Sequence, residues 1–199
     1  MGKRILTLVG GISINSINKK LYKNILQLDH QDMNLESFDI SKLPYFSQDI
    51  ENEPPDIVEE FKDEIRNCDA TLFITPEYNR SFPGVLKNAI DWGSRPYGKN
   101  LWDKKIAAIM GASIGNIGTF GAQHHLRQVF AYLNMYVMPQ PEFYFNYTQA
   151  LDSVGNFTKE ANEIIQNFLN SFQDWIDYHY SYETSITPRA TEDLHITNE

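Results

Sequence analysis

The sequence has little of what three classes of protein depend on. Its 199 residues include one cysteine, Cys68, so neither an intramolecular disulfide nor a CxxC metal knuckle can form. No apolar run comes near the roughly 20 residues that span a bilayer, and the first residues lack the apolar stretch of a secretory signal. Basic residues are scarce as well, because 17 Lys and Arg against 26 Asp and Glu leave a net charge of −9. We therefore expect a cytoplasmic protein that binds neither membrane nor nucleic acid.

What the sequence does contain indicates a folded α/β protein. The composition is 42% hydrophobic and 13% aromatic, which excludes disorder for most of the chain. Short apolar runs typical of buried strands alternate with segments whose apolar residues recur at helical spacing. The expected strands cover residues 4–9, 35–38, 70–75, 105–110 and 136–145, and the helices after them carry apolar stripes that start at Ile17, Ile57, Val85, Leu126 and Ala161. This alternation predicts three layers, in which a five-stranded parallel sheet of flavodoxin-like order 2-1-3-4-5 has helices on both faces.

The end of the chain is less regular. Pro139 and Pro141 interrupt the fifth expected strand and place it at a sheet edge or make it irregular. The last helix is expected from Thr158 to about His179. One domain should therefore span residues 1–179, followed by a polar C-terminal tail at 180–199.

Ligands of such sheets bind at the carboxyl ends of the strands, near the point where the strand order reverses. That rule selects the loops at residues 10–18, 76–82 and 111–121. In the first of them, Gly10 and Gly11 precede a helix start that bears Ser13, Ser16 and Asn18. Backbone N–H groups and the helix dipole make such a loop an anion site. The same residues also suit an ordinary turn in which Ser16 caps the helix.

The second loop holds Pro76, Glu77, Tyr78 and Asn79 at the tip of a central strand. An aromatic ring and backbone amides there could flank a planar ligand. A solvated turn before a helix that begins at Pro83 explains the same residues.

The third loop contains Ser113, Gly115 and Gly118, a spacing similar to a dinucleotide-binding fingerprint whose first glycine is replaced. It follows the fourth strand instead of the first, and no acidic residue lies about 20 positions further on. Both facts disfavour a Rossmann-type dinucleotide site.

Three blocks of the sequence resemble the NAD(P)H-dependent FMN reductase family, which includes bacterial quinone, chromate and azo reductases. Residues 10–21 (GGISINSINKKL) are similar to the GSLRxxSxNxxLA opening of that family, and residues 75–92 (TPEYNRSFPGVLKNAIDW) to its central signature. Residues 111–113 (GAS) and 126–128 (LRQ) resemble its third block. The resemblance runs from about residue 3 to 176. It implies a flavodoxin-like fold, bound FMN and two-electron reduction by NADPH or NADH.

The resemblance also implies which residues hold the cofactor. Ser16 and Asn18 would bind the FMN phosphate, beside Gly10, Gly11 and Ser13. The isoalloxazine ring would lie between the second and third loops, lined largely by backbone groups of Pro76, Glu77, Tyr78, Asn79, Ser113 and Gly115. Where the family often has Gly-Ser-Leu-Arg, this chain has GGIS, so a cation and one hydroxyl are missing from the phosphate loop.

These features together predict an FMN-dependent NAD(P)H oxidoreductase domain. Hydride would pass from the nicotinamide to the flavin and on to a quinone, an azo compound, a metal oxyanion or free flavin. No catalytic side chain is expected, because the cofactor carries the chemistry. The alternatives are a non-enzymatic electron carrier or regulatory flavin module of the flavodoxin type, which needs no nicotinamide site, and a flavin-free hydrolase on the same fold.

A homodimer or homotetramer is also expected. Two helices next to the predicted site bear apolar side chains suited to a subunit contact, namely Ile90, Trp92, Phe120, Phe130 and Tyr132. The resemblance implies dimers that pair into tetramers. No metal site is expected, because the adjacent His124 and His125 point about 100° apart on a helix.

Overall fold

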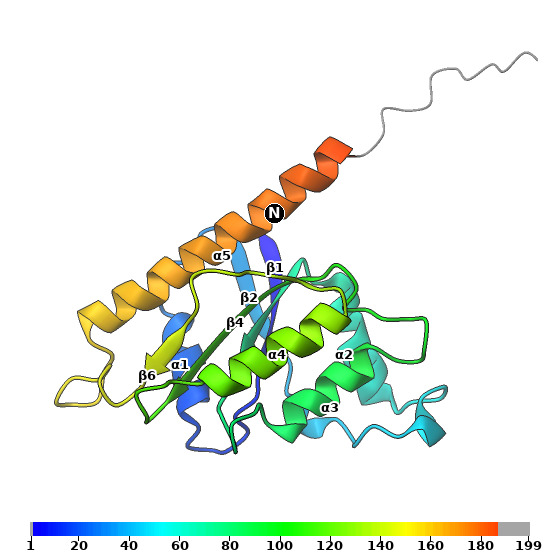
Figure 1. Ribbon diagram of the computed structural model, residues 1–199, viewed down its shortest axis with the longest axis horizontal. Helices are drawn as coiled ribbons and strands as arrows, with labels where there is room; N and C mark the ends of the chain where they lie inside the picture. The colour runs from blue at the N-terminus through cyan, green and yellow to red at the C-terminus, as the bar shows by residue number, and fades with distance from the viewer. Residues whose placement is uncertain (1, 187–199) are drawn as a thin grey trace, which may run out of the picture.

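The strands of the protein form one parallel sheet (Figure 1). The computed structural model describes residues 2–186, with side chains through Tyr182. The strands β1 (Lys3–Val9), β2 (Met33–Ser37), β3 (Ala70–Ile74), β4 (Ile106–Ser113) and β5 (Tyr136–Val137) lie in the order β2-β1-β3-β4-β5. All of these pairings are parallel. The strand order predicted from the alternation of elements is confirmed.

The strand expected at residues 136–145 is two strands instead of one. β5 pairs with the start of β4, whereas β6 (Tyr144–Asn146) pairs with its last three residues. Pro139 and Pro141 lie between the two, and without a backbone N–H they cannot continue the ladder. Within residues 2–186 the sheet therefore has six strands, and β6 lies beside the loop that follows β4.

Helices cover both faces of the sheet. One hydrophobic cluster packs α1 (Ile17–Ile25) and α5 (Lys159–Ile186) against it, and a second packs α2 (Asp56–Asn67), α3 (Gly84–Gly93) and α4 (Phe120–Tyr132) on the opposite face. Two single turns of 3-10 helix, η1 (Ile40–Lys42) and η2 (Gln48–Ile50), follow β2. None of the helices within residues 2–186 is long and apolar enough to cross a membrane.

The central strands are apolar throughout because both of their faces are buried. Ile5 and Leu72 join the cluster under α1 and α5. Their chain neighbours Leu6 and Phe73 join the cluster under α2, α3 and α4. Successive strand residues point to opposite faces, so a strand between two helix layers needs a continuous apolar run.

Three of the five side chains expected at a subunit contact belong to the core instead. Ile90, Trp92 and Phe130 are 1%, 0% and 0% exposed. The Trp92 indole Nε1–H donates to the Pro44 carbonyl oxygen at 2.8 Å. An apolar residue on a helix suits a core or an interface equally well. In this structure all three side chains are buried in the hydrophobic cluster under α2, α3 and α4.

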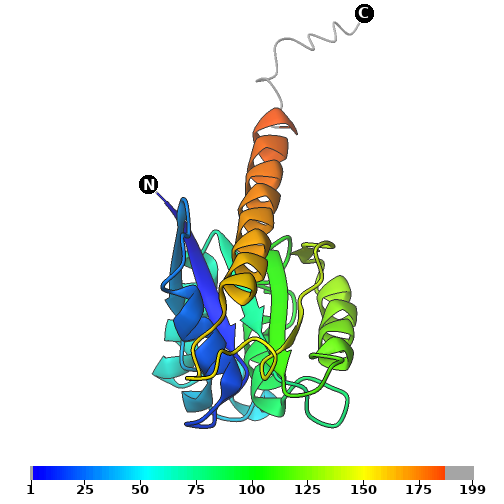
Figure 2. The same cartoon turned by 90° about the vertical axis from the view of Figure 1, so that its left-hand side faces the viewer.

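The last helix is longer than its sequence suggests. α5 continues seven residues past His179, to Ile186, and Figures 1 and 2 show it running beyond the end of the sheet. Tyr180 helps to hold this part, because its hydroxyl donates to Asp69 and the Lys3 ammonium lies 3.2 Å from its ring centroid. Residues 180–186 of the expected tail are therefore helical, and residues 187–199 lie outside the described part.

Thr158 caps the start of α5. Its Oγ1 accepts a hydrogen bond from the Ala161 N–H at 3.2 Å. We expect Thr158→Ala to lower the free energy of unfolding by about 1 kcal/mol, because the first-turn N–H loses its acceptor. Urea denaturation measures this, with Thr158→Ser as the variant that keeps the cap. An unchanged transition for the alanine variant would show that the cap contributes nothing.

Candidate active site

Three loops lie side by side at the carboxyl edge of the sheet, at the bottom of Figure 1. In the structure the first, second and third loops cover residues 10–16, 75–83 and 114–119 and follow β1, β3 and β4. Ser113, which was expected in the third loop, is the last residue of β4. Backbone hydrogen bonds join the starts of the loops. Gly10 N–H donates to the Ile74 oxygen at 2.8 Å, and Thr75 N–H donates to the Met110 oxygen at 2.9 Å.

The first loop wraps closely around the start of α1. A Cβ on Gly11 would lie 2.2 Å from the Ser16 Oγ, so a side chain there would push the Ser16 hydroxyl out of its capping position. The Ser16 Oγ accepts from the Lys19 N–H at 3.3 Å and caps the helix. Ser13 is exposed, and the first N–H groups of a helix have no acceptor within it. A helix start of this kind is suited to binding an anion.

Asn18 has a different role from the predicted one. It is fully buried, its Nδ2 donates to the Ala112 oxygen at 3.0 Å, and its Oδ1 accepts from the Ala112 N–H at 2.9 Å. The side chain thus ties the first turn of α1 to the end of β4. Its position does not support the predicted contact with a phosphate, and we replace that contact with a positioning role.

The second loop contains a tight two-residue turn. Tyr78 and Ser81 exchange backbone hydrogen bonds of 2.8 and 3.0 Å. Asn79 and Arg80 between them have φ angles of 51° and 66°. Two successive left-handed residues define the turn type that closes hairpins, and asparagine tolerates it well. The turn carries exposed Tyr78, Asn79 and Arg80 out from the sheet edge.

Two further contacts fix this loop in place. A Cβ on Gly10 would lie 3.3 Å from the Pro76 Cδ, so glycine lets the first and second loops approach each other. The Glu77 carboxylate accepts from the Ala122 N–H in the first turn of α4 at 3.2 Å and forms an ion pair with Arg80 at 3.2 Å. A carboxylate at a helix N-terminus is favoured by the helix dipole.

A slot of about 400 Å³ opens between the second and third loops. Its size falls within the usual range of cofactor sites. Of the predicted residues, it brings together Glu77, Asn79, Ser113 and Gly115. The other lining residues, Arg80, Asn116, Ile117 and Gly118, were not predicted as site residues. Only their position in these loops could have marked these residues as part of a site, because their residue types do not point to one.

A second cavity of about 530 Å³ adjoins the first and second loops and is lined by Gly10, Tyr78 and Tyr45, among others. The Tyr45 side chain is 88% exposed, but its backbone is held in place. Asn88 on α3 accepts from the Phe46 N–H at 2.8 Å and donates to the Pro44 oxygen at 2.9 Å. This wall could not be predicted from the sequence, because residues 39–55 have the composition of a polar loop.

Tyr144 on β6 lies beside the third loop and has a perturbed pKa. Its hydroxyl is 3.1 Å from the His124 Nε2. Burial, followed by the hydrogen bond to the Glu142 carboxylate and the charge of that carboxylate, raises the pKa of Tyr144 to about 12. Each cause favours the neutral phenol, because an ionised oxygen would be poorly hydrated and repelled by Glu142.

This shift predicts how Tyr144 titrates. In the unfolded chain the phenol loses its proton near pH 10, and in the folded protein near pH 12. Its contribution to stability is therefore complete below about pH 10 and is lost as the pH rises through about 12. Burial also raises the pKa of Tyr22, so ultraviolet absorbance of phenolate should show late titration from both residues, and Tyr144→Phe should remove the Tyr144 part of it. A Tyr144→Phe titration that overlays the wild-type curve would contradict the assignment.

Comparisons with known proteins agree with this geometry. The family model for NADPH-dependent FMN reductase matches residues 3–150. A 2-hydroxy-1,4-benzoquinone reductase from a Burkholderia species is 42% identical over 178 residues, which is 88% of this chain and 97% of that protein. A quinone reductase from Pseudomonas putida is 41% identical over 174 residues, or 86% of this chain and 94% of that one. The solved structure of FerB, a flavoenzyme NAD(P)H:(acceptor) oxidoreductase from Paracoccus denitrificans, is similar with a TM-score of 0.83 and 37% identity over 89% of this chain and 98% of that chain.

These similarities place the fold and its three loops in one class of protein, the FMN-dependent oxidoreductases that take electrons from NADPH or NADH. The chain belongs to the NADPH-dependent FMN reductase family. The predicted family, enzyme class and cofactors are confirmed.

Proposed function

We propose that FMN binds across the three loops and that the enzyme reduces quinones. The observation that carries this proposal is that the first loop, at the start of α1, lies close to the second loop, which in turn lines the slot, all at one edge of the sheet. When bound, FMN accepts hydride from the nicotinamide and passes two electrons to the acceptor. The protein has to bind the phosphate, orient the ring and leave space for the partners.

The phosphate would lie on the first loop. The dianion meets a protein of net charge −9, so its binding depends on local groups. Ser13, Ser16, the N–H groups of the loop and the start of α1 supply hydrogen bonds. The Lys19 ammonium donates to the Ile12 oxygen at 2.9 Å, which brings a cation to the loop that lacks the arginine of the family.

The ring would occupy the slot between the second and third loops. Glu77 and Asn79 line this slot and Tyr78 lines the cavity beside Tyr45, so we place the ring along the second loop, over backbone groups of Pro76, Glu77, Tyr78 and Asn79 and opposite Ser113 and Gly115. The tight turn at Asn79 and the Glu77 bond to α4 support this arrangement, because they tie the second loop to itself and to α4 beside the slot.

The acceptor would enter the cavity between Tyr45 and Tyr78. Two exposed phenol rings beside a cavity of about 530 Å³ suit a planar aromatic substrate. Relatives named quinone reductase support the same choice. The nicotinamide would use the same space before the quinone does, so one cavity would serve both the donor and the acceptor.

Steady-state kinetics test the choice of acceptor. With NADPH as donor, we expect Tyr45→Ala to raise the KM for a benzoquinone by about three- to tenfold, since an aromatic contact is worth roughly 0.5–1.5 kcal/mol. The rate with ferricyanide, which needs no aromatic pocket, should stay unchanged. Tyr97→Ala is the matched control, because Tyr97 is 87% exposed and does not line this cavity. Equal quinone kinetics for both variants would exclude Tyr45 from the acceptor site.

We further propose a homodimer in the cytoplasm. Phe120 and Tyr132 on α4 remain 45% and 85% exposed, and Ile117 in the third loop is 53% exposed. Apolar exposure next to the flavin loops supports a subunit contact there. The single thiol, Cys68, is buried, which suits a reducing compartment. Light scattering at micromolar concentration tests the dimer, and a monomer would contradict it.

A further inference from the structure

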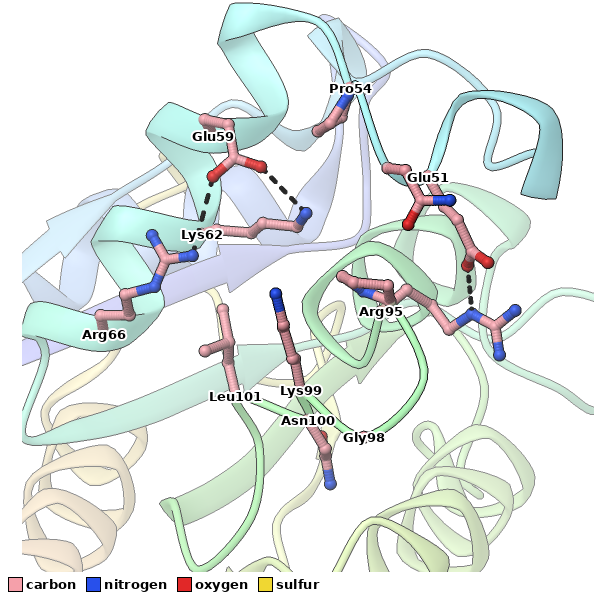
Figure 3. Close-up of a pocket in the computed structure, with 12 residues that line it drawn as sticks. Glu51, Pro54, Glu59, Lys62, Arg66, Arg95, Gly98, Lys99, Asn100 and Leu101 are labelled. Atoms are coloured by element: carbon pink, nitrogen blue, oxygen red, sulfur yellow. Dashed lines mark hydrogen bonds and ion pairs between the residues drawn. The ribbon is translucent and has the colours of Figure 1, made fainter.

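A cavity of about 500 Å³ lies away from the three loops, between α2 and the segments around Glu51 and residues 95–101 (Figure 3). It shares no lining residue with the slot or with the cavity beside Tyr45. Its wall is charged, and the mechanism above uses none of it. We ask what such a cavity could bind.

Cations outnumber carboxylates in this wall. Four basic side chains, Lys62, Arg66, Arg95 and Lys99, face two acidic ones, Glu51 and Glu59. Glu51 is paired with Arg95 at 2.8 Å. Glu59 is shared between Lys62 at 3.1 Å and Arg66 at 3.6 Å. Arg66 also pairs with Asp63 outside the cavity wall. Even with Asp63 counted, four cations face three carboxylates, so the cavity keeps an excess positive charge in a protein whose net charge is −9.

Two ammonium groups carry the argument. Lys62 is buried, with a side chain only 3% exposed, and one carboxylate serves its three N–H donors. Lys99 forms no ion pair with any described residue. In Figure 3 the ends of both side chains point into the same space. Like charges that converge on one cavity repel each other unless an anion lies between them.

We propose that this cavity is a second anion site, which binds a small molecule through a phosphate group. Ammonium and guanidinium donors from two elements match the oxygens of a phosphate, which carries nearly two negative charges. The volume exceeds that of an inorganic ion, so a phosphorylated small molecule fits. Such a ligand would join α2 to the 95–101 segment. The proposal is independent of the acceptor assigned to the flavin site.

Calorimetric titration of the FMN-loaded protein with inorganic phosphate and with pyrophosphate, at constant ionic strength, tests the site. FMN occupies the first loop during the titration, and the flavin spectrum reports any release of the cofactor. We expect saturable binding with no loss of FMN. Lys99→Gln and Lys99→Glu should each weaken it by about tenfold or more, since a hydrogen bond to a charged group is worth roughly 1.5–3 kcal/mol.

The variants are chosen so that folding does not confuse the result. Lys99 is exposed, and its substitution removes no described ion pair. Arg66→Gln is a second, independent variant that removes another cation from the cavity wall. Lys159→Gln is the matched control, because it removes one exposed cation from α5. The proposal would be overturned if neither phosphate nor pyrophosphate bound saturably. It would also be overturned if the Lys99 variants bound them as tightly as Lys159→Gln does. Displacement of FMN by phosphate would likewise overturn it, because the binding would then belong to the first loop.

Discussion

Replacing Ser16 with alanine is expected to weaken FMN binding on the order of 10- to 150-fold. The hydroxyl caps α1 and stands at the helix start where the phosphate would bind. A hydrogen bond to a charged group contributes roughly 1.5–3 kcal/mol, and about 1.4 kcal/mol corresponds to a tenfold change. Titration of the apoprotein with FMN, followed by quenching of flavin fluorescence, measures the dissociation constant.

Two controls separate the phosphate contact from the helix cap. Ser16→Thr keeps a hydroxyl and should bind FMN nearly as the wild type does. Ser47 also caps a helical turn, since its Oγ accepts from the Asp49 N–H at 3.2 Å, but it lies outside the three loops. Ser47→Ala should therefore lose stability only. If Ser16→Ala binds FMN as tightly as the wild type, the phosphate does not lie at the start of α1.

The second large effect is expected at Asn18. Asn18→Ala leaves both the N–H and the C=O of Ala112 without a partner inside the protein. We expect the free energy of unfolding of the apoprotein to fall by roughly 2–5 kcal/mol, because each buried unsatisfied group costs about 1–3 kcal/mol. FMN affinity should fall as well, since the first and third loops lose the bond that joins their elements.

A nearby asparagine supplies the comparison for this change. Asn24 lies on the same helix and is only partly buried, with its Nδ2 bonded to the Asn162 Oδ1 at 2.7 Å. Asn24→Ala should cost about 1 kcal/mol or less. Urea denaturation of both apoproteins distinguishes a positioning role of Asn18 from a direct contact with the phosphate. An Asn18→Ala variant of unchanged stability that has lost FMN would restore the direct phosphate contact predicted from the sequence.

The sequence predicted best those features that depend on residues near one another in the chain. Continuous apolar runs such as residues 70–74 predict strands buried on both faces, and their order follows from the alternation with helices. Strand order in turn predicts that the three loops share one edge. For the first loop, the residues suited both an anion site and a capped turn. The structure shows Ser16 as the cap, and capping does not exclude an anion at the same helix start.

The errors arose from contacts between distant parts of the chain. Asn18 meets Ala112 across 94 residues, and no local pattern reveals that the amide turns inward. Trp92 and Phe130 could equally have lain in a core or an interface, because helical spacing does not say what covers a helix. The part of α5 past His179 includes Tyr180, which donates to Asp69, a contact that composition does not reveal.

Anaerobic titration of the FMN-loaded protein with NADPH, and separately with NADH, tests the central claim most directly. An oxidoreductase that takes hydride at this site should show rapid and complete loss of the oxidised flavin absorbance with about one equivalent of nicotinamide per flavin. A quinone added afterwards should restore that absorbance. A flavin that does not respond to either nicotinamide, or that stops at one electron, would contradict the account and favour an electron carrier.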